Sequence, residues 1–107
     1  MAITINIYYK GSGENAKRFA DEMIASGIVE KIQNEDGNLR YEYFYPRNDR
    51  NTVLLIDSWK DQESLDIHHA SSIMEEIVKL REKYDLHMTV EKYVSDADIG
   101  DSKYIRK

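Results

Sequence analysis

The most apolar stretch of the chain, Thr52-Val-Leu-Leu-Ile-Asp-Ser-Trp59, decides the fold. It has the length and the branched side chains that are typical of a β-strand. Side chains alternate across a strand, so its two faces carry different sets: Val53, Leu55, Asp57 and Trp59 against Leu54 and Ile56. Apolar residues on both faces predict a central strand that is covered on both sides.

Three further strands are expected around this one. Alternation of apolar and polar residues predicts them over residues 3–9, 39–45 and 86–93. The polar segment 46–51 is short enough to connect the second and third strands as a hairpin.

Two regions have helical spacing. The first helix is expected to begin after Ser12, as its N-cap, and to run to about Asn34 with a weak point at Gly27. The second is expected to run from its N-cap Asp61 to about Tyr84. The two helices connect the first strand to the second and the third strand to the fourth.

The resulting order, βαββαβ, predicts an α+β protein with a ferredoxin-like antiparallel sheet. Right-handed crossovers place both helices on one face of that sheet. The other face is left bare, although the central strand is apolar there, and the chain has no further helix to cover it. A second copy of the chain is the economical cover, so we expect a homodimer with a two-fold axis.

The composition limits the chemistry of such a chain. Its 107 residues predict one domain, residues 1–93, followed by a tail, residues 94–107. The absence of cysteine excludes a disulfide framework, a thiolate zinc site and a thiol nucleophile. A net charge of −5 disfavours nucleic acid as a partner. No apolar run could span a membrane and no signal peptide is recognised, so a cytoplasmic protein is expected.

Two segments resemble the antibiotic biosynthesis monooxygenase (ABM) family. Residues 37–42, GNLRYE, are similar to the family's GxLxYE strand, and residues 55–68, LIDSWKDQESLDIH, to its acid-x-Trp strand end and Leu-x-x-His helix start. The resemblance covers about residues 2–93. It implies a dimeric α/β barrel of two ferredoxin-like subunits and a cofactor-independent oxidation of quinols or polyketide phenols by molecular oxygen. Related barrels degrade haem or isomerise small phosphorylated ketones, so the fold is implied more firmly than the reaction.

Asn6 and His68 are the candidate catalytic residues. Asn6 lies on the face of the first strand opposite the isoleucines, where its amide could donate to a phenolate or be satisfied by a neighbour. The adjacent His68 and His69 cannot both face the core. A helix break at residues 71–72 would let His68, three residues after Leu65, enter a pocket. The resemblance favours His68 as the base that removes a phenolic proton, against a surface histidine pair.

Aromatic side chains and the second histidine are the candidate substrate-binding residues: Trp59, Tyr8, Tyr43 and His69. Trp59 could stack on an aromatic substrate, although its position favours a structural role where the sheet meets the helices. Tyrosine supplies eight of the eleven aromatic residues, which can line a phenol pocket or pack a dimer interface. Asp57 requires a partner, and Arg40 or Lys92 is expected to form a structural ion pair with it.

No cofactor and no metal are expected. Adjacent histidines lack the i, i+4 spacing of a helical metal site. Haem-degrading relatives use Trp where His68 stands and an iron-ligating His where Val78 stands, so the haem pattern fails. The expected function is the oxidation of a small phenolic or quinol-like molecule. An isomerase of a small phosphorylated ketone of the autoinducer-2 phosphate type, and a dimeric ligand-binding protein without chemistry, stay open.

Overall fold

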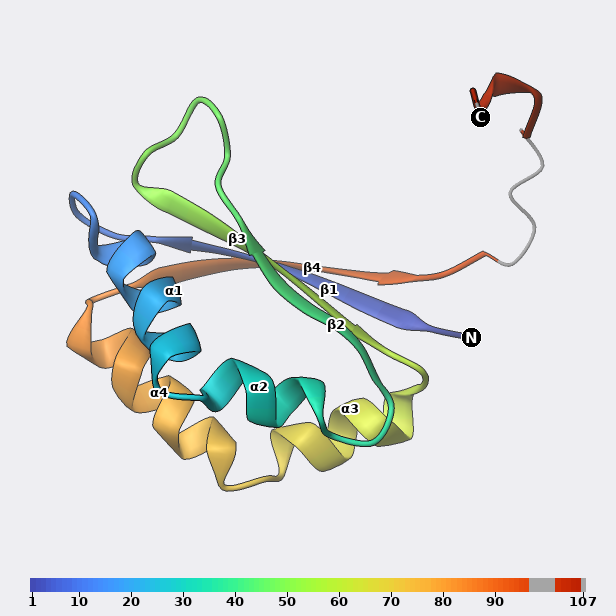
Figure 1. Ribbon diagram of the computed structural model, residues 1–107, viewed down its shortest axis with the longest axis horizontal. Helices are drawn as coiled ribbons and strands as arrows, with labels where there is room; N and C mark the ends of the chain where they lie inside the picture. The colour runs from blue at the N-terminus through green and yellow to red at the C-terminus, as the bar shows by residue number, and fades with distance from the viewer. Residues whose placement is uncertain (97–101, 107) are drawn as a thin grey trace.

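The computed structural model describes residues 1–96 and 102–106, which form a four-stranded antiparallel sheet with helices on one face (Figure 1). The elements in chain order are β1 (Ile3–Lys10), α1 (Asn15–Ala25), α2 (Ile28–Gln33), β2 (Asn38–Phe44), β3 (Thr52–Trp59), α3 (Gln62–His69), α4 (Ile73–Lys83), β4 (His87–Val94) and the 3-10 turn η1 (Ser102–Tyr104). The predicted α+β, ferredoxin-like order is confirmed. The predicted tail 94–107 lies partly outside the described residues.

The strands lie in the order β2-β3-β1-β4, and each neighbouring pair is antiparallel. The predicted central strand has the bounds expected from its sequence, Thr52–Trp59. Asp57 of this strand is paired with Ile5 of β1 on one side and with Tyr41 of β2 on the other. These three side chains therefore lie in one row across the helix-covered face of the sheet.

Each of the two predicted helices is divided into two. Gly27 has a φ of 85°, in the left-handed region that favours glycine, so α1 ends before it and α2 begins after it. The second helix is interrupted at residues 70–72, where the backbone N–H and the hydroxyl of Ser71 both donate to the carbonyl of His68. This interruption places His68 and His69 at the end of α3.

One of the two expected helix caps is present. The carboxylate of Asp61 accepts a hydrogen bond of 2.8 Å from the backbone N–H of Ser64 and caps α3. The expected side-chain cap at Ser12 is wrong, because a turn follows it and α1 begins only at Asn15. The backbone carbonyl of Ser12 accepts the N–H of Asn15 instead, at 3.0 Å.

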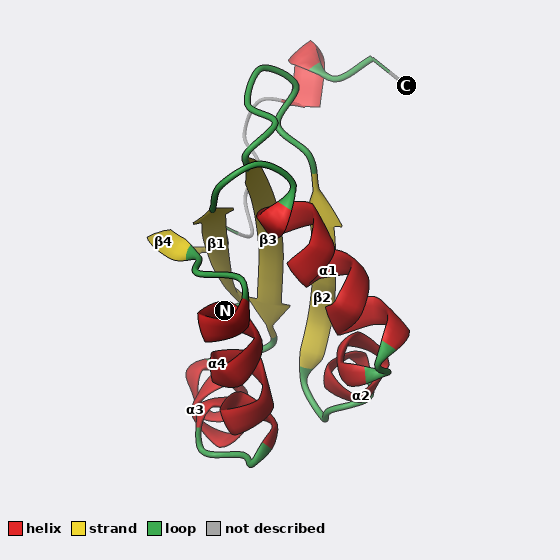
Figure 2. Ribbon diagram, turned by 90° about the vertical axis from the view of Figure 1, so that its left-hand side faces the viewer, coloured by secondary structure: helices red, strands yellow, loops and turns green. Residues whose placement is uncertain are grey.

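The core lies between the helices and one face of the sheet (Figure 2). It is formed by large side chains that are at most 2% exposed, among them Phe19, Met23, Ile32, Leu55, Trp59 and Leu65. No helix of the described residues covers the opposite face, which we call the open face (Figures 1 and 2). By strand alternation it carries Thr4, Asn6, Tyr8, Leu54 and Ile56. No helix in the described part of the chain is long and apolar enough to cross a membrane.

Candidate active site

A cavity of about 200 Å³ lies between α3 and α4 and the helix-covered face of the sheet. Most of its wall is apolar: Ile5, Ile7, Leu55, Met74, Ile77, Met88 and Val90. A few polar side chains interrupt this wall: Tyr9, Tyr41, Asp57, His68, His69 and Arg81. Pockets for drug-sized molecules begin at roughly 300 Å³, so this cavity suits a molecule of one or two rings.

His68 reaches the cavity from the end of α3 and is held in one orientation. It is 2% exposed, its ring is stacked on Trp59 with centroids 4.7 Å apart, and its Nδ1 lies 2.8 Å from Oε2 of Glu35. A carboxylate only accepts hydrogen bonds, so Nδ1 carries a proton, and in the neutral ring Nε2 then keeps a lone pair. Among the described residues, Nε2 has no hydrogen-bond partner. This is the arrangement of a general base positioned by a carboxylate.

Asp57 places a second proton-transfer group in the same wall. The residue is 4% exposed, and its Oδ1 accepts a hydrogen bond of 2.7 Å from Nε1 of Trp59. Burial raises the pKa of the Asp57 carboxyl to about 7, helped by the charge of Glu35 and opposed by the Trp59 hydrogen bond. Asp57 can therefore gain or lose a proton near neutral pH.

The expected ion pair of Asp57 with Arg40 or Lys92 is not formed. Nε of Arg40 donates to Glu42 at 3.2 Å, because both side chains lie on the open face. Nζ of Lys92 donates to Gln62 at 2.7 Å, at the exposed edge of the sheet. Without a cation to stabilise its charge, the buried carboxyl keeps its raised pKa.

His69, Tyr9 and Tyr41 complete the polar lining. His69 is exposed on its outer side, with its ring centroid 5.7 Å from that of His68. Partial burial and the charge of His68 lower the pKa of His69. Burial raises the pKa of Tyr9 to about 12 and that of Tyr41 well above its usual value. Both phenols therefore stay protonated and can donate hydrogen bonds to a ligand oxygen.

The remaining predicted site residues lie away from this cavity. Asn6 and Tyr8 are on the open face, where Asn6 is paired with Ile56, so the structure does not bring Asn6 and His68 together. The reason is strand alternation, which sends Asn6 and its isoleucine neighbours to opposite faces. Oδ1 of Asn6 is buried without a hydrogen-bond partner among the described residues.

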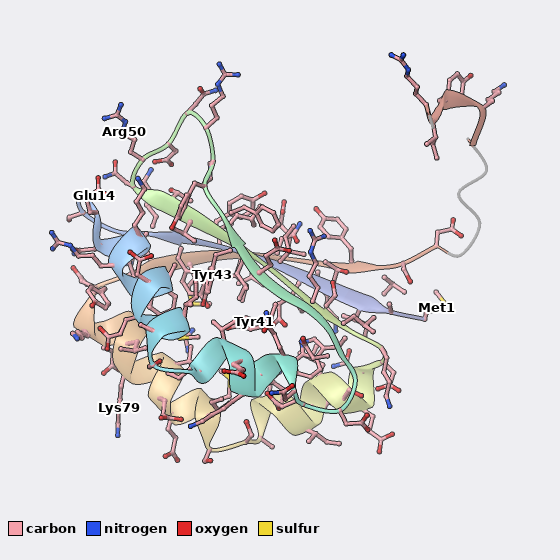
Figure 3. All side chains as sticks on the ribbon, viewed as in Figure 1. Met1, Glu14, Tyr41, Tyr43, Arg50 and Lys79 are labelled. Atoms are coloured by element: carbon pink, nitrogen blue, oxygen red, sulfur yellow. The ribbon has the colours of Figure 1, made fainter. Side chains whose placement is uncertain are left out.

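Two predicted aromatic residues lie in the core or pack against it, rather than in the cavity wall. Trp59 is fully buried behind His68 and Asp57, which it contacts through its ring face and its Nε1. Tyr43 packs edge-on against Phe19 of α1, with centroids 6.3 Å apart. Figure 3 shows Tyr41 and Tyr43 together on the helix side of β2, but only Tyr41 reaches the cavity.

The sequence alone did not single out five polar residues of the site as functional groups: Tyr9, Glu35, Tyr41, Asp57 and Arg81. A carboxyl in the most apolar strand was a signal for Asp57, but its partner could not be read from the sequence. Glu35 lies in a turn 33 residues before His68, and nothing in the sequence links the two. In residues 1–96 and 102–106, no three His, Asp or Glu side chains gather as a metal site.

Comparison with known proteins agrees with this architecture. The family model "Antibiotic biosynthesis monooxygenase" matches residues 2–80. A Bacillus subtilis (strain 168) protein described as "Putative monooxygenase YcnE" is 27% identical over 70 residues, which are 65% of this chain and 72% of that protein.

Solved structures show the same fold at lower identity. A "putative antibiotic biosynthesis monooxygenase" from Deinococcus radiodurans superposes with a TM-score of 0.78, at 17% identity over 92% of this chain and 96% of that one. SnoaB from Streptomyces nogalater, described as a cofactor-independent oxygenase, gives a TM-score of 0.74, at 12% identity over 94% and 98% of the two chains.

Proposed function

Since this chain belongs to the antibiotic biosynthesis monooxygenase family, we propose that it oxidises a small phenolic or quinol-like molecule with molecular oxygen and without a cofactor. The family and the relatives support an oxidoreductase of the monooxygenase type. The observation that carries the finer proposal is His68, a buried base positioned by Glu35 and facing an apolar cavity of about 200 Å³.

The proposed reaction begins with removal of the phenolic proton. Nε2 of His68 accepts this proton, and the Glu35 carboxylate stabilises the imidazolium that forms. The phenolate then passes one electron to oxygen, and the two radicals combine into a peroxide at a ring carbon that carries hydrogen. Loss of water leaves a quinone, so one phenol and one O₂ give one quinone and one H₂O. The substrate supplies all four electrons.

Asp57 is proposed to move the second proton. Loss of water from the peroxide takes a proton from the ring carbon and gives one to the leaving oxygen. A carboxyl with a pKa near 7 can give a proton to that oxygen and then regain one from the carbon at neutral pH. Tyr9 and Tyr41 are proposed to donate hydrogen bonds to the substrate oxygen, since their raised pKa values keep them protonated. In this scheme Trp59 holds Asp57 and His68 in place and does not touch the substrate.

Oxygen uptake with a panel of small phenols and hydroquinones tests this proposal. With 1-naphthol as substrate we expect one O₂ consumed per naphthoquinone formed, and labelled O₂ should place one atom in the product and one in water. His68→Ala should lower kcat by about a hundredfold or more. The control His87→Ala removes an exposed histidine of β4 outside the cavity and should leave kcat unchanged. Equal rates for the two variants would refute the role of His68.

A ketone isomerase is the second candidate, because Asp57 and His68 are two proton-transfer groups in one cavity and could move a proton between carbons without oxygen. Turnover of a phosphorylated hydroxyketone under strict anaerobiosis would support the isomerase and contradict the oxidation. A lack of turnover with every substrate, despite ligand binding, would favour a binding protein.

We also propose that the chain acts as a homodimer through its open face. This face carries Leu54 and Ile56 on the central strand, and no element of the described chain covers them. Tyr93 on β4 of the same face is 53% exposed. A monomeric mass at micromolar concentration in ultracentrifugation would contradict this.

A further inference from the structure

Arg81 brings a positive charge to the wall of the cavity and lacks a partner for it. The side chain comes from the last turn of α4, and its Nε is buried without a hydrogen bond among the described residues. Nη1 donates to Sδ of Met88 at 2.7 Å, but a thioether is a weak acceptor. Arg81 also lines a neighbouring hollow together with Glu82 and Asp85, yet it forms no ion pair within residues 1–96 and 102–106.

The guanidinium of Arg81 is suited to binding an acidic group of a ligand, since the protein itself supplies no such partner within the described residues. Arginine presents five N–H donors in a planar fork that matches a carboxylate, whereas buried donors without acceptors are unfavourable. Its charge reaches into the cavity, where it partly offsets the effect of burial on the pKa of Tyr9. An anionic group on the ligand would satisfy both the charge and the unpaired donors.

Arg81 and the proton-transfer groups lie at opposite ends of the cavity. Asp57 is paired with Ile5, and Met88, which Arg81 contacts, is paired with Tyr9. Ile5 and Tyr9 are four residues apart, which is about 13 Å along β1. On α4, Ile73 and Arg81 are eight residues apart, which is about 12 Å along the helix. The wall between the two ends is made of apolar side chains, chiefly Ile7, Leu55, Met74 and Ile77.

We infer that Arg81 binds a carboxylate of the substrate, and that the substrate is a small aromatic hydroxy acid. Its two-ring apolar body would fill the cavity, with the carboxylate at Arg81 and the hydroxyl at His68. A ligand with a single negative charge would match this cavity, since Arg81 is the one Lys or Arg that lines it in the described part of the chain. The identity of the reacting hydroxyl rests on the proposed function, whereas the carboxylate site does not.

Binding of two matched probes to the full chain tests this inference. 6-Hydroxy-2-naphthoate carries a hydroxyl and a carboxylate at opposite ends of two rings, and 2-naphthol lacks the carboxylate. Fluorescence titration of the wild-type protein should give a Kd for the acid at least about tenfold lower than for 2-naphthol. This comparison needs no variant, so it does not depend on whether a substituted chain folds.

Two substitutions in α4 then test whether Arg81 causes the preference for the acid. Arg81→Gln should abolish the preference for the acid and leave the affinity for 2-naphthol within about twofold. Lys79→Gln removes the same charge from the same helix, but Lys79 is exposed and points away from the sheet (Figure 3), so the preference should persist. Equal affinity of wild type for both probes, failure of both to bind, or a preference retained in Arg81→Gln would each overturn the inference.

The outcomes also separate this inference from the proposed oxidation. Arg81-dependent binding of the acid, without oxygen uptake from any phenol, would refute the oxidation and support the carboxylate site. Oxygen uptake from neutral phenols, with no preference for the acid, would support the oxidation and refute the carboxylate site.

Discussion

Replacing Asp57 by Asn should make the stability of the protein less dependent on pH. In the folded protein the pKa of Asp57 is raised from its ordinary value of 3.8 to about 7, because the carboxyl is buried and lies near the charge of Glu35. Between these two values the unfolded chain has released the proton and the folded chain still holds it. The stability contributed by this proton is complete below about pH 4 and is lost as the pH rises through about 7.

The magnitude follows from the difference in pKa. About three pKa units at 1.36 kcal/mol each amount to on the order of 4 kcal/mol. The wild-type protein should lose about this much stability from this group between pH 4 and pH 8, whereas Asp57→Asn has no ionisation at the site. The amide oxygen of the variant can still accept the hydrogen bond from Nε1 of Trp59.

The assay is urea unfolding of both proteins at a series of pH values and one protein concentration. The free energy of unfolding of Asp57→Asn minus that of wild type should rise by about 4 kcal/mol from pH 4 to pH 8. Asp66→Asn, which neutralises an exposed carboxyl on α3, controls for the loss of one negative charge. A pH-independent difference between Asp57→Asn and wild type would refute the raised pKa. The variant should also lose turnover if Asp57 moves the second proton.

Three further substitutions test the positioning of the base, the packing of α3 and the open face. Glu35→Gln should lower kcat about tenfold or more, because the His68 imidazolium loses its carboxylate partner, and it should leave the thermal midpoint unchanged. An unchanged kcat would exclude Glu35 as the residue that positions His68. Gly37→Ala should destabilise the protein by at least about 2 kcal/mol in urea unfolding, because Gly37 has a φ of 87° and an added Cβ would lie 2.6 Å from Cβ of Ser64. A variant as stable as the wild-type protein would contradict this prediction. Ile56→Asp should weaken dimerisation by more than a hundredfold in ultracentrifugation, because the dimer would bury the unpaired charge of the new carboxylate. An unchanged dimer would show that the interface lies outside the open face.

If Asp57→Asn is more stable than the wild-type protein at neutral pH, this result bears on the function of Asp57. A charge that lowers the stability of the folded state at neutral pH is retained most readily where it serves a reaction. Asp57 would then resemble Arg81, whose buried Nε also lacks a partner within the described chain. Both residues line the same cavity, at its two ends.

The hydrophobic pattern of the sequence was sufficient to predict the sheet and the layer of helices. Period-two alternation located three of the strands, and the apolar run of residues 52–59 located the fourth, each within about one residue. The helix interruptions were less predictable. Gly27 could be recognised as a weak point, but only the φ of 85° turns that weakness into a break between α1 and α2. The same holds for residues 70–72, whose break exposes His68 to the cavity.

The sequence by itself determined the fold class, the family and the face of each strand residue, because these depend on local periodicity and on motifs within short segments. It therefore already placed Asn6 opposite the isoleucines, although it did not show that His68 would face the other way. Only the tertiary structure decided the site. Contacts between Glu35 and His68, or between Arg81 and Met88, depend on how side chains from different elements pack. The raised pKa of Asp57 is likewise a property of its burial, which arises only when helices cover the sheet.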